Sequence, residues 1–189
     1  MAIICVMVSY FIGNISPAIL LSKAKGKDIR EEGSGNAGTT NILRIYGKKT
    51  AGFTFLIDVL KGVTAVLLSS YVCGTTVSYM CAVAVIFGHV FPVIYGFRGG
   101  KGVATGAGAI TAISPIVGLL TAVVAFSIIG LTKKVSLGSL AANFFFPIMV
   151  WKYVPEFLPY AVVIVVLILV KHRTNVLRLI KGEESKIKL

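Results

Sequence analysis

The chain has 189 residues, of which 56% are hydrophobic, and it carries 19 basic against 7 acidic residues, for a net charge of +12. This composition excludes an ordinary soluble protein and leaves no length for a separate soluble domain, so we expect residues 1–189 to form a single integral-membrane domain. The basic residues gather in loops beside apolar runs, which indicates anionic headgroups or phosphorylated substrates rather than nucleic acid.

The first apolar run, Met1–Ser22, is long enough to cross a hydrocarbon core of about 30 Å. Basic residues follow this run directly and do not precede it, which is the reverse of the charge order in a cleaved signal peptide. These residues are Lys23, Lys25, Lys27 and Arg30. We therefore expect a retained helix, with the N-terminus outside the cell and the basic loop in the cytoplasm.

A polar, glycine-rich stretch, residues 33–41, follows the basic loop and is closed by Arg44. Glycines let the backbone turn and bring N–H groups close to an anion, and an arginine adds charged donors. The alternative is a flexible linker, because Ser, Thr, Asn and Gly are ordinary loop residues. The stretch also matches the dinucleotide-binding string G-x-G-x-x-G, but a charged loop precedes it in place of the required strand.

Two further apolar runs, Ala51–Tyr71 and Thr76–Phe97, predict the second and third spans. Asp58 and Lys61 lie three residues apart in the second run, where pairing is the least costly way to keep two charges in a bilayer. We expect them to form a structural ion pair that supports the cytoplasmic site. His89, near the end of the third run, is interpreted as a hydrogen-bonded packing residue.

The next apolar run, Val103–Leu131, has Ser114-Pro115 near its middle and is either one kinked span or a hairpin of two short helices. We expect the hairpin, because it keeps Lys133, Lys134 and the basic tail in the cytoplasm. The arm 103–113 is short for a full crossing at about 1.5 Å per residue. Its small residues would let other helices pack closely against it.

Leu137–Val150 and Phe157–Val170 complete the expected fold. This fold is an all-α, polytopic membrane helix bundle with seven transmembrane helices, the N-terminus out and the C-terminus in. The cytoplasmic tail then carries His172 and Asn175.

Three polar elements, residues 34–44, 99–102 and 172–175, are expected to converge on the cytoplasmic face. They offer basic side chains and backbone N–H groups but almost no carboxylate, which is typical of a phosphate site. The loop at 99–102 resembles a Walker A string, but Gly102 replaces the Ser or Thr that would hold magnesium.

The sequence offers no cluster of ligands for a catalytic metal, and we expect neither metal nor cofactor. No acid is evidently placed to orient His172 in a serine triad. Cys5, Cys73 and Cys81 are interpreted as small apolar residues, with a Cys73–Cys81 disulfide as the alternative.

These motifs, taken in order, resemble those of the bacterial acyl-phosphate glycerol-3-phosphate acyltransferases, an integral-membrane family. The resemblance covers nearly the whole chain and rests on four segments: Gly33-Ser34-Gly35-Asn36-x-Gly38-x-Thr40-Asn41-x-x-Arg44, Asp58 to Gly62, Gly88 to Ala104, and His172-Arg173-x-Asn175 with the glutamates that follow. The turn Asn14-Ile15-Ser16-Pro17 departs from the family pattern, where more glycine and proline is expected, and this bears on helix packing.

The resemblance implies transfer of a fatty acyl group from acyl phosphate to the sn-1 hydroxyl of glycerol 3-phosphate, giving lysophosphatidic acid and inorganic phosphate for phospholipid synthesis. It implies a multi-pass protein of the bacterial cytoplasmic (inner) membrane, with the site on the cytoplasmic side and membrane lipid as its surroundings. The implied catalytic residues are Ser34, Arg44, Lys101, His172 and Asn175. The implied substrate-binding residues are Gly33, Gly35, Asn36, Gly38, Thr40, Asn41, Gly99, Gly100 and Gly102. Structural support is expected from Asp58, Lys61 and Glu183, with Glu184 as the alternative to Glu183.

Two other functions were weighed against acyl transfer. A transporter or flippase for a phosphorylated solute or lipid would need polar residues in the outer halves of the helices, which are almost wholly apolar. A lipid-binding scaffold would leave the glycine loops without a purpose. For the transfer itself we expect a direct reaction without an acyl-enzyme, in which a substrate phosphate takes the proton of the attacking hydroxyl.

Overall fold

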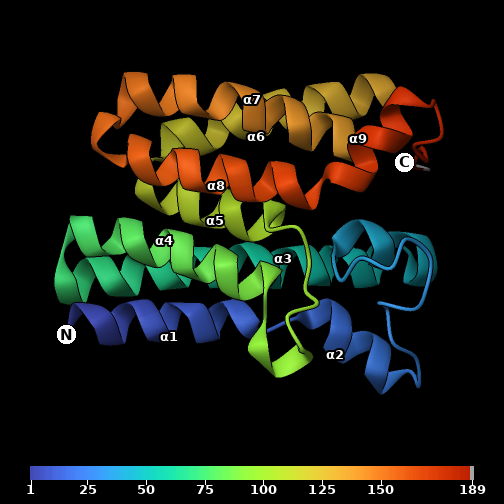
Figure 1. Ribbon diagram of the computed structural model, residues 1–189, viewed down its shortest axis with the longest axis horizontal. Helices are drawn as coiled ribbons and strands as arrows, with labels where there is room; N and C mark the ends of the chain where they lie inside the picture. The colour runs from blue at the N-terminus through green and yellow to red at the C-terminus, as the bar shows by residue number, and fades with distance from the viewer. Residues whose placement is uncertain (188–189) are drawn as a thin grey trace. The chain divides into compact units, whose positions relative to one another are not determined.

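The computed structural model describes residues 1–187, and every regular element within that range is a helix (Figure 1). The chain divides into two compact units. Unit 1 is Met1–Ile113, and unit 2 begins at Ser114.

Unit 1 is built from α1 (Ala2–Asn14), α2 (Pro17–Ala24), α3 (Thr39–Cys73), α4 (Thr75–Val90), the 3-10 helix η1 (Val93–Tyr95) and α5 (Val103–Ile113). Helix α4 packs against both α1 and α3, and α5 packs against α3 (Figure 1). Glycines allow two of these contacts: a methyl group on Gly88 of α4 would overlap the backbone of Tyr10, and one on Gly108 of α5 would overlap the backbone of Val59. The close packing predicted for the small residues of α5 is therefore present.

The first apolar run is broken, contrary to the single helix predicted over Met1–Ser22. Helix α1 ends at Asn14 and α2 begins at Pro17, with the Ile19 N–H donating to the Ser16 hydroxyl at 3.4 Å. Proline lacks an N–H and disfavours a helical residue before it, so one helix ends and a new one starts. The break releases the backbone carbonyl of Ile15 from the helical hydrogen-bond pattern.

Helix α3 is interrupted at Gly47, whose backbone has φ +81° and ψ −177°. A left-handed φ favours glycine, and it separates a short helical segment, residues 39–46, from the long apolar segment that follows. The short helical segment begins within the polar stretch of residues 33–41 and carries Arg44.

Unit 2 is built from α6 (Pro115–Thr132), α7 (Val135–Tyr153), the 3-10 helix η2 (Pro155–Phe157), α8 (Leu158–Lys171) and α9 (Arg173–Ile180). Helix α7 packs against both α6 and α8. The predicted break at Ser114-Pro115 is present, because α5 ends at Ile113 and Pro115 occupies the first position of α6. At the other end of the unit, α9 follows α8 with a bend of 58°.

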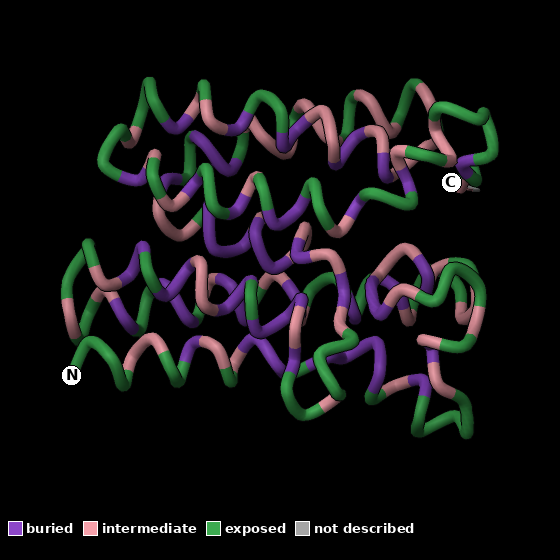
Figure 2. Tube along the Cα trace, in the orientation of Figure 1, coloured by how far each residue is buried: buried purple, intermediate pink, exposed green. Residues whose placement is uncertain are grey.

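Within residues 1–187, five helical segments are long and apolar enough to cross a membrane: Ala2–Ala24, Thr39–Cys73, Thr75–Tyr95, Pro115–Thr132 and Val135–Tyr153. The bent pair Pro155–Lys171 and Arg173–Ile180 makes a sixth if it is counted as one span. Large apolar side chains face outward, such as Leu131 with 82% of its surface exposed, and exposed residues recur along the helices (Figure 2). Such surfaces suit lipid, so the membrane class predicted from composition is confirmed. The shorter apolar helix Val103–Ile113 falls below the length of a full span, and the count of seven spans stays a prediction.

Candidate active site

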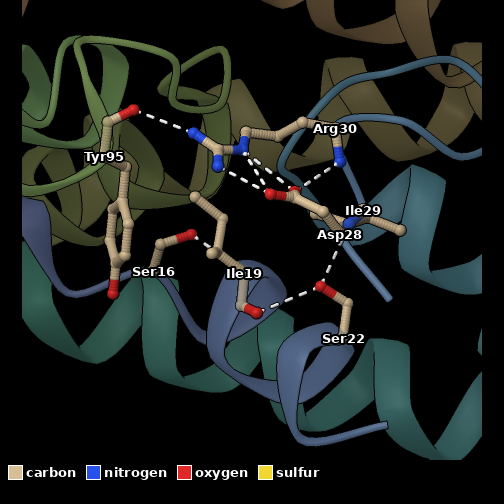
Figure 3. Close-up of polar contacts among 7 residues, drawn as sticks. All are labelled: Ser16, Ile19, Ser22, Asp28, Ile29, Arg30 and Tyr95. Carbon is tan, nitrogen blue, oxygen red and sulfur yellow. Dashed lines mark hydrogen bonds and ion pairs between the residues drawn. The ribbon is translucent and has the colours of Figure 1, made fainter. Parts of the chain in front are cut away.

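The loop between α2 and α3 is held by an arginine clamp, in which Arg30 binds Asp28 and Tyr95 (Figure 3). The Arg30 guanidinium donates to both carboxylate oxygens of Asp28, at 2.9 Å from Nε and 2.6 Å from Nη2, and its Nη1 donates to the carbonyl of Tyr95 at 2.8 Å. The Arg30 hydrogen bonds lower the pKa of Asp28 to about 2, so the clamp stays charged at neutral pH. Arg30 thereby ties the loop before residue 33 to the segment that leads into residues 99–102.

Asn41 shapes the polar stretch from within. Its side-chain amide donates to the carbonyls of Ile29 and Glu32, at 3.1 and 2.9 Å, and its Oδ1 accepts from the Ser34 N–H at 3.0 Å. Only 1% of Asn41 is exposed. A methyl group on Gly33, which has φ +58°, would overlap Asn41 Oδ1. All three of these side-chain contacts go to the loop, so Asn41 sets the shape of the stretch that is predicted to bind substrate.

The two glycine loops of unit 1 meet. Gly100 lies so close to the carbonyl of Ala37 and to the ring of His89 that a methyl group on it would overlap both. The Gly100 N–H donates to the carbonyl of His89 at 3.1 Å. The convergence predicted for residues 34–44 and 99–102 is therefore found within unit 1.

The glycine loop leads directly into α5. Gly102 has φ +83°, and its carbonyl accepts the N–H of Gly106 at 2.7 Å to close the first turn. The first N–H groups of a helix have no partner within it and attract anions. The hydroxyl of Thr105, in this first turn, is fully buried and has no hydrogen-bond partner among the residues described. The loop and helix together form a structure suited to a phosphate.

A buried network lies behind this loop. The predicted pair of Asp58 and Lys61 is present, with 2.6 Å between Oδ1 and Nζ. Lys61 Nζ also donates to the carbonyl of Ile15 at 2.8 Å and lies 2.7 Å from Nδ1 of His89. Sequence reasoning did not find the last two partners, although Pro17 signals the helix break that releases the Ile15 carbonyl.

The predicted site residues of unit 1 differ in their exposure. Ser34 and Arg44 are exposed, and Lys101 is half-buried. The other predicted substrate-binding residues are exposed at Gly33 and Gly35, half-buried at Asn36, Thr40 and Gly99, and buried at Gly38, Asn41, Gly100 and Gly102. The side chains best placed for direct contact with a soluble anion are thus Ser34, Arg44 and Lys101.

In unit 2, His172 marks the bend between α8 and α9. Its Nδ1 lies 2.8 Å from the carbonyl of Ile168. Because a carbonyl only accepts hydrogen bonds, Nδ1 of His172 is the donor in this contact. His172 is 2% exposed and Asn175 is 4% exposed.

Glu184, and not Glu183, holds the C-terminal segment in place. Glu184 accepts hydrogen bonds from the Ser136 hydroxyl at 2.7 Å, from Asn175 Nδ2 at 2.8 Å and from Arg178 Nε at 3.0 Å. Glu183 is exposed, so the structural role predicted for it is corrected to its neighbour. Burial opposes the charge on Glu184, but these three hydrogen bonds outweigh burial and lower the pKa of its carboxyl.

Comparison with known proteins identifies the family. Residues 3–182 match the family described as glycerol-3-phosphate acyltransferase. Relatives with this name from Thermoanaerobacter pseudethanolicus and Clostridioides difficile are each 42% identical to the chain; both comparisons cover 98% of the chain, and they cover 96% and 95% of the respective relative.

Two solved structures are similar to the chain throughout. Both are of PlsY (YgiH), described as an integral membrane glycerol 3-phosphate acyltransferase. The glycerol 3-phosphate form has a TM-score of 0.94 and 37% identity over 99% of this chain and 96% of that chain. The lysophosphatidic acid form has a TM-score of 0.91 and 36% identity over 99% and 95%. The resemblance inferred from the motifs is thus confirmed, and the chain belongs to the glycerol-3-phosphate acyltransferase family, the integral-membrane acyltransferases of phospholipid biosynthesis.

Proposed function

We propose that the protein transfers a fatty acyl group from acyl phosphate to the sn-1 hydroxyl of glycerol 3-phosphate, forming lysophosphatidic acid and inorganic phosphate. Family membership supports acyl transfer. The similar solved structures are named for a glycerol 3-phosphate form and a lysophosphatidic acid form, which are the acceptor and the product of such a transfer.

The observation that carries this proposal is the contact between the two glycine loops of unit 1. Gly100 rests on the carbonyl of Ala37, and the same loop opens α5. Phosphate at this position would receive backbone N–H groups and the charged donors of Lys101 and Arg44. The carboxylates of Asp28 and Glu32 are paired with Arg30 and Lys27 respectively.

Acyl phosphate is the proposed donor because the site is suited to two anions. Phosphate is a good leaving group, so the protein has mainly to position the donor and acceptor and to stabilise a tetrahedral oxyanion. A nucleophilic serine would need an adjacent base that is itself oriented, usually by a carboxylate, whereas Nδ1 of His172 faces a backbone carbonyl. These features support direct transfer without an acyl-enzyme.

In this mechanism the sn-1 hydroxyl oxygen attacks the acyl carbonyl carbon, and the bond from that carbon to the phosphate oxygen breaks. The hydroxyl proton passes to a phosphate oxygen of a substrate, whose second pKa of about 6 suits neutral pH. Ser34 and the neighbouring N–H groups bind phosphate or the developing oxyanion. His172 and Asn175 assist, and Asn175 is oriented by Glu184.

We also propose the seven-span arrangement, with the N-terminus outside, the C-terminus inside and the site on the cytoplasmic side of the bacterial inner membrane. The break before Pro115 supports a hairpin over residues 103–131. Its first arm, α5, has 11 residues and reaches about 16 Å at 1.5 Å per residue, so it would enter the bilayer without crossing the full core.

The test uses purified full-length protein in nanodiscs with labelled glycerol 3-phosphate. Acyl phosphate should support lysophosphatidic acid formation with stoichiometric phosphate release, and acyl thioesters should not. Activity with thioesters alone would refute the proposed donor. Incubation with labelled acyl phosphate in the absence of acceptor, followed by denaturation, should leave the protein unlabelled. Label on Ser34 that glycerol 3-phosphate discharges at the rate of turnover would refute direct transfer.

A further inference from the structure

His89 lies between the buried charges and the glycine loop. It stands one residue before the end of α4, and it is 6% exposed. On one side its Nδ1 lies 2.7 Å from Lys61 Nζ. On the other side its Nε2 lies against Gly100, and its carbonyl accepts the Gly100 N–H. One residue thus contacts both the network in the helix core and the loop proposed to bind phosphate.

The contact with Lys61 determines the state of the imidazole ring. A lysine ammonium donates hydrogen bonds and cannot accept them, so Nδ1 is the acceptor and the ring proton lies on Nε2. The other candidate partner, Asp58 Oδ1, is 3.3 Å from Nδ1, which is longer than the 2.7 Å contact to Lys61. Lys61 also donates to the Ile15 carbonyl and forms an ion pair with Asp58, so the ammonium contacts three groups.

The loop has little freedom to move away from this ring. A methyl group on Gly99 would overlap the carbonyl of His89 and the ring of Pro92, and one on Gly100 would overlap Nε2. The end of α4 is fixed in turn, because the Tyr10 hydroxyl donates to the carbonyl of Phe91 at 2.8 Å. A displacement of the His89 ring would therefore displace the backbone just before Lys101.

We propose that His89 is a positioning residue for the Gly99–Gly102 loop, held by Lys61 in the tautomer that carries its proton on Nε2. The inference rests on the proposed function, since it assigns the loop to the phosphate of glycerol 3-phosphate. In this proposal the buried pair of Asp58 and Lys61 fixes the orientation of the His89 ring beneath the loop.

The first test is spectroscopic. The sequence contains two histidines, so their signals can be assigned separately. Protein labelled with ¹⁵N-histidine, in nanodiscs at neutral pH, should show one ring protonated on Nε2 and one protonated on Nδ1. The His172→Asn variant should remove the second pattern and so assign the first to His89. A His89 signal with its proton on Nδ1 would overturn the proposal.

The second test separates positioning from packing by comparing His89→Asn with His89→Ala. The asparagine oxygen can still accept from Lys61 but leaves Gly100 without the ring, so this variant should unfold at a higher temperature than His89→Ala. Both should raise the KM for glycerol 3-phosphate about tenfold or more and leave the KM for acyl phosphate unchanged, because displaced binding groups cost this much. A His89→Asn protein with the wild-type KM for glycerol 3-phosphate would show a packing role and overturn the proposal.

Gly100→Ala approaches the same contact from the loop, and it should raise the KM for glycerol 3-phosphate, because the added methyl group would overlap His89 Nε2 and the carbonyl of Ala37. An unchanged KM in this variant would also count against the proposal. If the wild-type protein showed no acyl-transfer activity, the proposed function itself would be refuted. The histidine spectrum would still test the His89 geometry in that case.

Discussion

Replacing Lys61 by methionine tests the buried network most directly. The lysine is 5% exposed and contacts three acceptors: Asp58 Oδ1, the Ile15 carbonyl and His89 Nδ1. Methionine has a similar length but no charge and no donor, so Lys61→Met keeps much of the packing and removes all three contacts. The Asp58 carboxylate, 1% exposed, would then be buried without its counter-charge.

Removing one partner of a buried ion pair costs about 3–5 kcal/mol, because an uncompensated charge is left in a low-dielectric site. The carbonyl of Ile15, which the helix break deprives of a helical partner, adds a cost of about 1–3 kcal/mol if it stays unsatisfied. In a chain of this length each kcal/mol lowers the melting temperature by about 2–4 °C. The lower figure of 3 kcal/mol alone therefore predicts a fall of about 6–12 °C.

The assay is thermal unfolding in detergent, followed with a thiol-reactive dye that reports exposure of the buried Cys81. The matched control is the double variant Asp58→Asn/Lys61→Met, which should recover most of the loss because neither charge remains buried. Lys49→Met, at an exposed lysine, should leave the melting temperature unchanged. The reasoning would be refuted if Lys61→Met had the melting temperature of the wild type, or if the double variant were no more stable than the single one.

Three further predictions concern the site and its placement. Arg44→Ala and Lys101→Ala should each lower kcat/KM about ten- to a hundredfold, because each removes a charge-assisted contact. The effect of Lys101→Ala should fall mainly on the KM for glycerol 3-phosphate. Unchanged kinetics for Lys101→Ala would show that the loop is not part of the site. Glu184→Gln should lower the melting temperature and Glu183→Gln should not. Because the pKa of Glu184 is lowered in the folded state, its contribution is present above the unfolded pKa and is lost as pH falls through the folded value, so wild type and Glu184→Gln should converge in acid; a difference that persists there would contradict this assignment. In a protein stripped of its native cysteines, an impermeant maleimide added to intact cells should label a cysteine at position 152 and spare one at position 133, and the reverse result would overturn the proposed orientation.

The features that the sequence predicted well are those with local signals. Proline after serine placed the break at residue 114, and the three-residue spacing of Asp58 and Lys61 in an apolar run predicted their pairing. Glycine spacing predicted where the loops lie, because few residues other than glycine tolerate a left-handed backbone such as that of Gly102.

The features that were missed depend on contacts between distant parts of the chain. Lys61 meets Ile15 and His89 across 46 and 28 residues, and no periodicity in the sequence encodes such a meeting. The hydrogen bonds of the Asn41 side chain to its own loop were also not predicted, because a polar residue at this position suits either a loop contact or a substrate contact. The choice between two adjacent glutamates depends on which side of an irregular segment faces inward. Helical periodicity could have predicted which glutamate faces inward, but the helix does not continue past Gly182, whose φ is +75°.

The interruption of α3 at Gly47 has a consequence for how the protein tolerates membranes of different thickness. Bilayers vary in thickness by a few ångströms, and a long span adapts by changing its tilt. If α3 were one rigid rod of 35 residues, any tilt of its apolar part would swing its first turns, and Arg44 with them, through the plane of the headgroups. A hinge between the two helical segments absorbs that rotation, while the Arg30 clamp holds the preceding loop to the carbonyl of Tyr95. The surface that carries Arg44 can thus keep its geometry while the apolar span changes its tilt in bilayers of different thickness.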